Sequence, residues 1–236
     1  IEIGLSDPPL NPARPNKPEL VRAGEVPRRR PNTLNGQIAI LHSIAHIELN
    51  AVDLHWDIIA RFANIQMPVG FYDDWVKSAQ EESNHFNLIC DCLEELGSYY
   101  GDLTAHDGLW QAAIDTRDDL LGRLAVVPMV LEARGLDVTP NMIRLFEKAK
   151  LKNAVKALKT IYEEEVSHVA YGSKWFNFLC GRNNLDPKIE FHRLVTKYFN
   201  GFLKPPFNEE KRADAGLPPD FYWPLADQLN INTSYK

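Results

Sequence analysis

The chain has few cysteines and lacks the cysteine patterns of disulfide-rich and metal–thiolate proteins. Its 236 residues include three, Cys90, Cys92 and Cys180, an odd number without a Cys-x-x-Cys pair. This disfavours a disulfide framework, a structural zinc site and an iron–sulfur centre. Reduced cysteines suit a reducing compartment, so we expect a cytoplasmic protein.

The sequence also lacks long apolar segments, as membrane-spanning helices have, and lacks an excess of positive charge, as many nucleic-acid-binding proteins have. The uncharged stretch at 31–47 is too short and too polar to provide the ~20 apolar residues that span a bilayer, and we expect no signal peptide at the start of the sequence. Lys and Arg total 26 against 32 Asp and Glu, a formal net charge of −6. We therefore expect no membrane association. Nucleic acid ranks low as a partner, although the basic run Arg28–Arg30 does not exclude it.

No alternating pattern of β-strands competes with helical spacing along the chain. Apolar residues recur at helical intervals over four long segments, 34–64, 72–96, 108–134 and 151–180, and two shorter ones, 140–150 and 187–202. Gly135 is expected to end the third long helix. The stretch 97–108 is long enough for one crossover along a bundle. The sequence thus predicts an all-α protein with a four-helix bundle.

Prolines mark the two ends of this bundle. Seven of the 16 prolines lie in the first 31 residues, and five more lie at 205–224. Proline lacks a backbone N–H and disfavours regular structure. We expect an extended N-terminal arm at 1–32, a bundle at 33–202 and an extended C-terminal arm at 203–236. Trp56 and Trp175 are expected to pack within the bundle.

Six polar residues fall on or beside apolar stretches of the four long helices: Glu48, Glu82, His85, Glu132, Glu165 and His168. Four carboxylates facing one bundle interior cannot remain charged without compensation, because each buried charge costs several kcal/mol. Two divalent ions would supply +4, and two neutral imidazoles would complete a set of oxygen and nitrogen donors suited to iron or manganese.

The spacing of these residues is more specific than their types. Residues three apart share a helix face, so Glu82-x-x-His85 and Glu165-x-x-His168 can each direct two donors at one ion. A shuffled chain of this composition would hold about half a Glu-x-x-His match by chance. Glu48 precedes the first pair by 34 residues and Glu132 precedes the second by 33, which indicates a duplicated helix pair.

This set resembles the ligands of the ferritin-like di-metal carboxylate proteins, residue by residue. Four further segments, Ala-His-Ile-Glu-Leu (45–49), Ala-His-Asp-Gly-Leu-Trp (105–110), Leu-Glu-Ala-Arg-Gly-Leu-Asp-Val-Thr-Pro (131–140) and Leu-Lys-Pro-Pro-Phe-Asn (203–208), resemble the family catalogued as domain of unknown function 455. The resemblance covers most of the chain. It implies a ferritin-like four-helix bundle with one long crossover, and a metal site without an established substrate.

Three residues near the expected ligands are weaker candidates for a role at the site. Tyr162 lies three residues before Glu165, and His55 lies two helical turns after Glu48. A buried tyrosine and a hydrogen-bonded histidine are the ordinary alternatives. Arg134 follows Glu132 by two positions and would balance a carboxylate, or else interact with the C-terminal dipole of its helix.

The function predicted from these residues is an O2-dependent oxidoreductase, an oxygenase or oxidase with an Fe/Fe or Mn/Fe centre. Its partners would be a small-molecule substrate and an electron donor, and a homodimer remains open. Three alternatives remain: a ferritin-type protein that oxidises or stores metal, an enzyme like the tRNA hydroxylases, and a metal-free helical interaction module.

Overall fold

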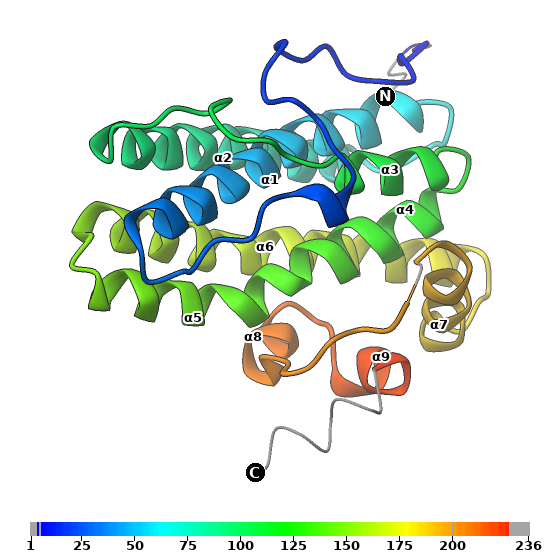
Figure 1. The fold of residues 1–236 in the computed structure, drawn as a ribbon. Helices are drawn as coiled ribbons and strands as arrows, with labels where there is room; N and C mark the ends of the chain where they lie inside the picture. The colour runs from blue at the N-terminus through cyan, green and yellow to red at the C-terminus, as the bar shows by residue number, and fades with distance from the viewer. Residues whose placement is uncertain (1–3, 5, 200, 227–236) are drawn as a thin grey trace. The chain divides into compact units, whose positions relative to one another are not determined.

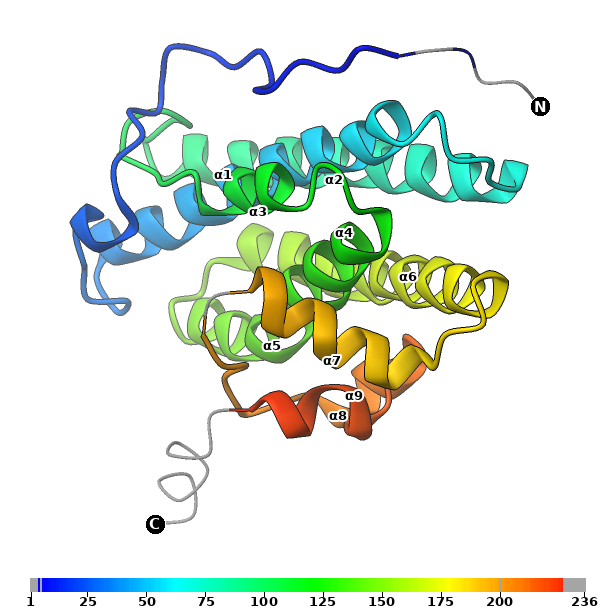
Figure 2. The ribbon, with the colours of Figure 1, turned by 90° about the vertical axis from the view of Figure 1, so that its right-hand side faces the viewer.

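The structure, a computed structural model, describes residues 4, 6–199 and 201–226 (Figures 1 and 2). Within these residues all regular elements are helical. The pairing between extended segments there is confined to two isolated bridges, Leu20–Ala105 and Leu203–Ala226. The all-α class predicted from apolar spacing is therefore confirmed.

The chain forms two compact units. Unit 1 consists of residues 1–114 and 141–161, and unit 2 of residues 115–140 and 162–236. Two helices, α5 (Ala133–Lys148) and α6 (Lys152–Arg182), contribute residues to both units. The predicted boundaries of a bundle at 33–202 remain a prediction.

Unit 1 is built on two long helices, α1 (Leu34–Arg61) and α2 (Val69–Glu95), which lie side by side (Figure 1). Thr33 caps α1, because its hydroxyl accepts a hydrogen bond from the Gly36 N–H at 3.2 Å. The unit also contains η1 (Ala23–Glu25) and most of α3 (Gly108–Asp115). One hydrophobic core joins α1 and α2 to parts of α5 and α6, through Leu41, Ile44, Ala45, Ile89, Cys92, Leu93, Ile143, Phe146, Ala154, Ala157, Leu158 and Ile161.

The N-terminal segment is attached to α1 by ionic contacts. The Arg14 side chain donates a hydrogen bond from Nη2 to Oδ1 of Asn50 at 2.6 Å. Its Nε lies 3.3 Å from Oδ2 of Asp53, and its Nη1 lies 3.4 Å from Oδ1 of Asp107. The segment predicted as an arm therefore contributes a cation to the polar surface of unit 1.

Two histidines of α1 hold the loop that follows α2. His42 Nε2 accepts hydrogen bonds from the backbone N–H groups of Gly101 and Leu103, at 3.0 and 3.4 Å. His46 Nδ1 lies 2.9 Å from the Tyr100 hydroxyl. Burial lowers the pKa of both imidazoles, for His46 to about 4. His42 can accept these bonds only while it is neutral.

We expect unit 1 to lose stability when His42 is forced to take up a proton. Burial sets its folded pKa below the ordinary value of 6.5, so at pH below 6.5 the unfolded chain binds more protons than the folded one. The stability that neutral His42 contributes is thus complete above pH 6.5 and is lost as the pH falls through the folded pKa. The unfolding free energy can be measured by urea denaturation at pH 7.5 and at pH 5.5. Its decrease between the two pH values should be smaller for His42→Gln than for wild type. Equal decreases would contradict this account.

Unit 2 contains α4 (Leu120–Val126), the π-helical segment η2 (Val127–Glu132), α7 (Pro187–Tyr198), α8 (Glu209–Asp214), α9 (Pro219–Tyr222) and η3 (Trp223–Leu225), with its parts of α5 and α6. Asp119 caps α4, with its Oδ1 accepting from the Gly122 N–H at 2.9 Å, and its Oδ2 accepts from the Tyr198 hydroxyl at 2.9 Å. Residues 203–226 of the predicted C-terminal arm thus contain three short helices.

The helix predicted at 108–134 is wrong in its continuity and in its end. The structure breaks it between α3 and α4, and α5 continues through Gly135 to Lys148 with Pro140 inside it. The predicted stop at Gly135 and separate helix at 140–150 are therefore also wrong. Ala133 and Leu136 are fully buried on either side of Gly135, and this packing outweighs the ~1 kcal/mol that glycine costs inside a helix.

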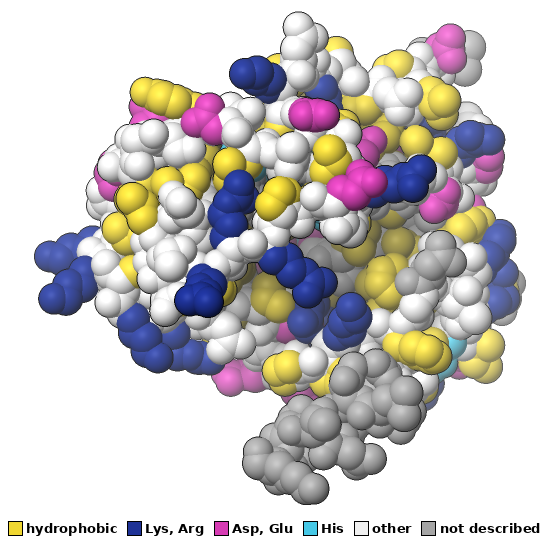
Figure 3. Space-filling view, viewed as in Figure 1, with side chains coloured by type: hydrophobic (Ala, Val, Ile, Leu, Met, Phe, Trp, Pro, Cys, Tyr) yellow, Lys and Arg dark blue, Asp and Glu magenta, His cyan; other side chains and the backbone are white. Residues whose placement is uncertain are grey.

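The predicted burial of the two tryptophans is half right. Trp175 is 4% exposed, whereas Trp56 is 48% exposed. On the face shown in Figure 3, basic, acidic and hydrophobic side chains are interspersed. The three basic residues at 28–30 are exposed. Among the described residues, no helix has the length and apolar character needed to cross a membrane.

Candidate metal centre

Unit 1 brings together three of the six predicted ligands. Glu48 comes from α1, and Glu82 and His85 come from adjacent turns of α2. Glu48 is 3% exposed and the other two are fully buried. His85 Nδ1 lies 3.3 Å from a carboxylate oxygen of Glu48 and 3.3 Å from one of Glu82. One donor atom from each residue lies within 4.8 Å of the others, so this buried cluster can hold a metal ion.

The electrostatics of the cluster favour a cation. Burial lowers the pKa of His85, but its hydrogen bonds to Glu48 and Glu82 and their charges outweigh burial and raise the pKa to about 11. Two carboxylates with one imidazolium carry −2 + 1 = −1 in a site closed to water. A divalent ion bound by two carboxylates and a neutral imidazole instead gives −2 + 2 = 0. The donor set fits iron or manganese, which accept both oxygen and nitrogen ligands.

Two further ring side chains of α1 and α2, His55 and Trp75, are buried and lie close to each other. Trp75, two turns before Glu82, is fully buried. The His55 ring is also fully buried and lies 5.2 Å, centroid to centroid, from the Trp75 indole. His55 is thus interior, and its predicted role in supporting a ligand stays a prediction.

Unit 2 contains the other three predicted ligands. Glu165 and His168 lie one turn apart on α6, 9% exposed and fully buried respectively. His168 Nδ1 lies 3.9 Å from Oε2 of Glu165. Glu132 is half-buried and ends the π segment η2. Each unit therefore carries one lone glutamate and one Glu-x-x-His pair, and the duplication of a helix pair stays a prediction.

The π segment that leads to Glu132 is absent from the sequence prediction. Pro128 has no N–H to donate to the carbonyl one turn earlier, and the Ala133 N–H instead reaches the Pro128 carbonyl five residues back. Such single-turn π segments occur frequently at functional sites. The one available signal was Pro128 inside an apolar run, which indicates a disturbed helix but not its kind.

Close contact between Pro128 and α6 depends on Gly172. A Cβ added to Gly172 would lie 2.5 Å from Cβ and 2.6 Å from Cγ of Pro128. We expect Gly172→Ala to destabilise the protein by about 1–3 kcal/mol, because the added methyl group overpacks this contact. Gly135→Ala is the matched control: nothing lies within 4 Å of its Cβ position, so it should leave stability unchanged or raise it by up to ~1 kcal/mol. Equal effects in urea denaturation would contradict the role of the contact.

Tyr162 and Arg134 contact the segment that follows α7. The Tyr162 hydroxyl accepts a hydrogen bond from Nδ2 of Asn208 at 2.6 Å. Arg134 lies in the first turn of α5, so an interaction with a helix C-terminus is wrong for it. Its Nη1 donates to the Lys204 carbonyl at 2.6 Å and lies 3.4 Å from Oδ2 of Asp137. Roles for both residues at a metal site remain predictions.

Sequence reasoning also missed the part played by Asn208. Its side chain caps α8, accepting a hydrogen bond from the Lys211 N–H at 3.2 Å. Its Nδ2 also donates to the Leu136 carbonyl at 3.1 Å. An asparagine directly before two glutamates is a helix-start signal and could have revealed α8.

The comparisons with known proteins agree with the motifs of the chain. An uncharacterised protein of Haemophilus influenzae is 42% identical over 210 residues, which cover 87% of this chain and 73% of that protein. No solved structure matches the chain. The family described as protein of unknown function (DUF455) matches residues 3–223, and the chain belongs to this family.

Proposed function

We propose that this chain is a ferritin-like di-metal carboxylate protein that acts as an O2-dependent oxidoreductase on a small organic substrate. The observation that carries the proposal is the buried cluster of Glu48, Glu82 and His85. Two buried carboxylates that converge on one imidazole stabilise a fold poorly, because the cost of removing charges from water exceeds most of what their attraction returns. They suit a site whose stability comes from a bound cation.

The repetition of the donor set supports two ions rather than one. Glu132, Glu165 and His168 provide unit 2 with the same donor types in the same order as unit 1. We propose that the six residues together hold two metal ions, Fe/Fe or Mn/Fe. Such ions, when bound, supply the electrons and open coordination positions that O2 chemistry requires.

The chain itself would bind the ions, orient the donors and exclude water. The glutamates hold the positive charge, and helical spacing fixes each Glu-x-x-His pair on one face. The residues of α4 and η2 before Glu132 are almost wholly buried, among them Leu124, Val127 and Met129. Buried apolar surroundings of this kind lower the effective dielectric constant and so strengthen electrostatic interactions inside the site. A substrate and a separate electron donor are the partners that the proposal requires.

Metal content and oxygen consumption test this function. Protein expressed in medium supplemented with iron and manganese should contain about two such ions per chain by mass spectrometry; less than one would overturn the proposal. Anaerobic loading with ferrous ion followed by O2 should give rapid O2 consumption that ends when the bound iron is oxidised. Continued uptake of iron into a large assembly on size exclusion would instead indicate storage.

A further inference from the structure

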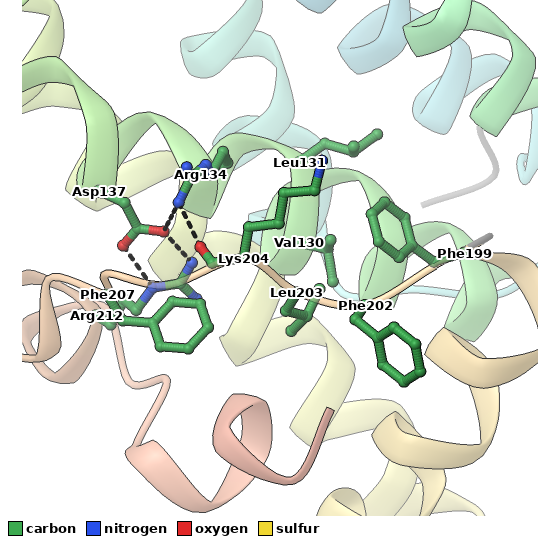
Figure 4. Close-up of a pocket in the computed structure, with 10 residues that line it drawn as sticks. All are labelled: Val130, Leu131, Arg134, Asp137, Phe199, Phe202, Leu203, Lys204, Phe207 and Arg212. Atoms are coloured by element: carbon green, nitrogen blue, oxygen red, sulfur yellow. Dashed lines mark hydrogen bonds and ion pairs between the residues drawn. The ribbon is translucent and has the colours of Figure 1, made fainter. Parts of the chain in front are cut away.

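A pocket of about 180 Å³ lies within unit 2, and none of the six predicted ligands is among the residues that line it (Figure 4). Its wall is formed by the end of η2, the start of α5, and Phe199, Phe202, Leu203, Lys204, Phe207 and Arg212. Figure 4 shows Arg134, Asp137 and Arg212 on one side, with the Phe207 ring beside Arg212, and Phe199 and Phe202 on the opposite side. A ligand that fits this pocket would have a charged group on one side and an apolar surface on the other.

The ionic side has more positive than negative charge. Arg134, Lys204 and Arg212 give +3 and Asp137 gives −1, a net +2. Arg212 already binds Asp137 through two hydrogen bonds, 2.9 Å from Nε and 2.7 Å from Nη2. Oδ2 of Asp137 also lies 3.4 Å from Nη1 of Arg134, so the one carboxylate of the pocket faces both arginines. A net charge of +2 is left to attract an anion.

Donors on this side remain available. Arg212 is 2% exposed, and its Nη1 is a buried donor without a hydrogen-bond partner among the described residues. Arg134 uses Nη1 for its two polar contacts, and neither its Nε nor its Nη2 makes a hydrogen bond or ion pair within the described part of the chain. The Lys204 side chain extends across the pocket toward Leu131 (Figure 4). Arginine forks match the two oxygens of a carboxylate.

The apolar side is suited to a ring. Phe202 is 66% exposed although it is a large hydrophobic residue, and Phe199 stands beside it (Figure 4). Leu203 and Val130 continue this wall. The volume is close to the ~150 Å³ of a cavity known to admit benzene, so one aromatic ring with a short acidic side chain fills it. Offset or edge-to-face contact with phenylalanine rings would hold such a ring in place.

We propose that this pocket binds a small aromatic monocarboxylate, with its carboxylate on Arg134 and Lys204 and its ring against Phe199 and Phe202. The proposal does not depend on the metal centre, because every residue it uses lies outside the predicted ligand set. The two can therefore fail separately.

Calorimetric titration of metal-free protein with phenylacetate tests the proposal. Saturable binding is expected with phenylacetate, and no measurable binding is expected with phenethylamine, which has the same ring and the opposite charge. Acetate and inorganic phosphate, which lack the ring, should bind at least about tenfold more weakly. Absence of saturation up to about 10 mM phenylacetate would overturn the proposal, as would equal binding of phenethylamine or of phosphate.

Variants locate the site. Lys204→Gln and Arg134→Gln should each weaken phenylacetate binding about tenfold, the loss expected for a hydrogen bond to a charged group. Phe202→Ala should weaken it several-fold through lost ring contact. Arg144→Gln is the matched control, since Arg144 lies on the same helix as Arg134 but does not line the pocket. Lys204 is exposed, so its variant should fold. A loss in Arg144→Gln equal to that in Lys204→Gln would overturn the assignment.

Discussion

Replacing Glu82 with glutamine is expected to abolish metal binding while leaving the metal-free protein about as stable as wild type. Glu82 is fully buried and shares His85 with Glu48. The substitution removes a charged oxygen donor but keeps the volume of the side chain and relieves repulsion between two carboxylates. Mutation of a residue that only supports a metal ligand typically lowers metal affinity about 10–100-fold, so loss of a ligand itself should lower it more than 100-fold.

Thermal unfolding with and without metal measures this expectation. At a metal concentration about 100 times the Kd, binding stabilises the folded chain by ~2.7 kcal/mol, which corresponds to a rise in Tm of roughly 5–10 °C for a chain of this size. The rise should be present in wild type and absent in Glu82→Gln. The matched control is Glu94→Gln, on the same helix but exposed, which should retain the full rise.

The opposite result has a clear meaning. If Glu82, Glu48 and His85 formed a structural ion pair, removal of one partner would destabilise the metal-free protein by about 3–5 kcal/mol and leave metal content unchanged. Glu82→Gln thus separates a metal centre from a buried salt bridge, which the same three side chains could otherwise represent.

The burial of Glu48 and Glu82 was predictable, because each glutamate takes a position where the helical repeat of apolar residues calls for an apolar one. The exposure of Trp56 was not predictable in this way. Apolar residues that recur in alternating steps of four and three follow a period of about 3.5 residues, and this line drifts by about 20° per heptad around a straight helix. Near the end of α1 the buried positions are Leu54, His55, Asp57 and Ile58 instead. Burial predicted from a repeating apolar pattern is therefore most accurate near the start of the helix, before the drift accumulates.

The elements around Glu132 escaped prediction for a different reason. Helix signals are local, whereas Pro128 of η2 packs closely against Gly172, a residue 44 positions away on α6. The pocket of unit 2 is likewise assembled from η2, α5, Phe199 and residues 202–212, and no spacing rule connects Arg134 to Phe202. Contacts of this kind depend on tertiary packing, which a single sequence does not display.

Asp137→Ala is expected to be the most destabilising change in unit 2. Asp137 is 7% exposed and binds the buried guanidinium of Arg212 through two hydrogen bonds, and its Oδ1 also accepts from the Asn208 N–H at 2.9 Å. Removing the carboxylate leaves the Arg212 charge buried without its counterion, at a cost of about 3–5 kcal/mol. Tm should fall by roughly 10 °C or more. Asp214→Ala, which breaks an exposed pair with Lys211, should change stability by at most ~1 kcal/mol.

A double variant identifies the cause of this loss. The Arg212 guanidinium lies 4.9 Å from the centroid of the Phe207 ring and 4.6 Å from that of Tyr222, so part of its contribution comes from aromatic contact rather than from Asp137. In Asp137→Leu/Arg212→Met both charges are gone, and methionine keeps a polarisable group between the rings. Replacement of a buried ion pair by apolar residues is often neutral or stabilising, so most of the lost stability should return in urea denaturation. A double variant as unstable as Asp137→Ala would show that hydrogen bonds and packing geometry, rather than an uncompensated charge, account for the loss.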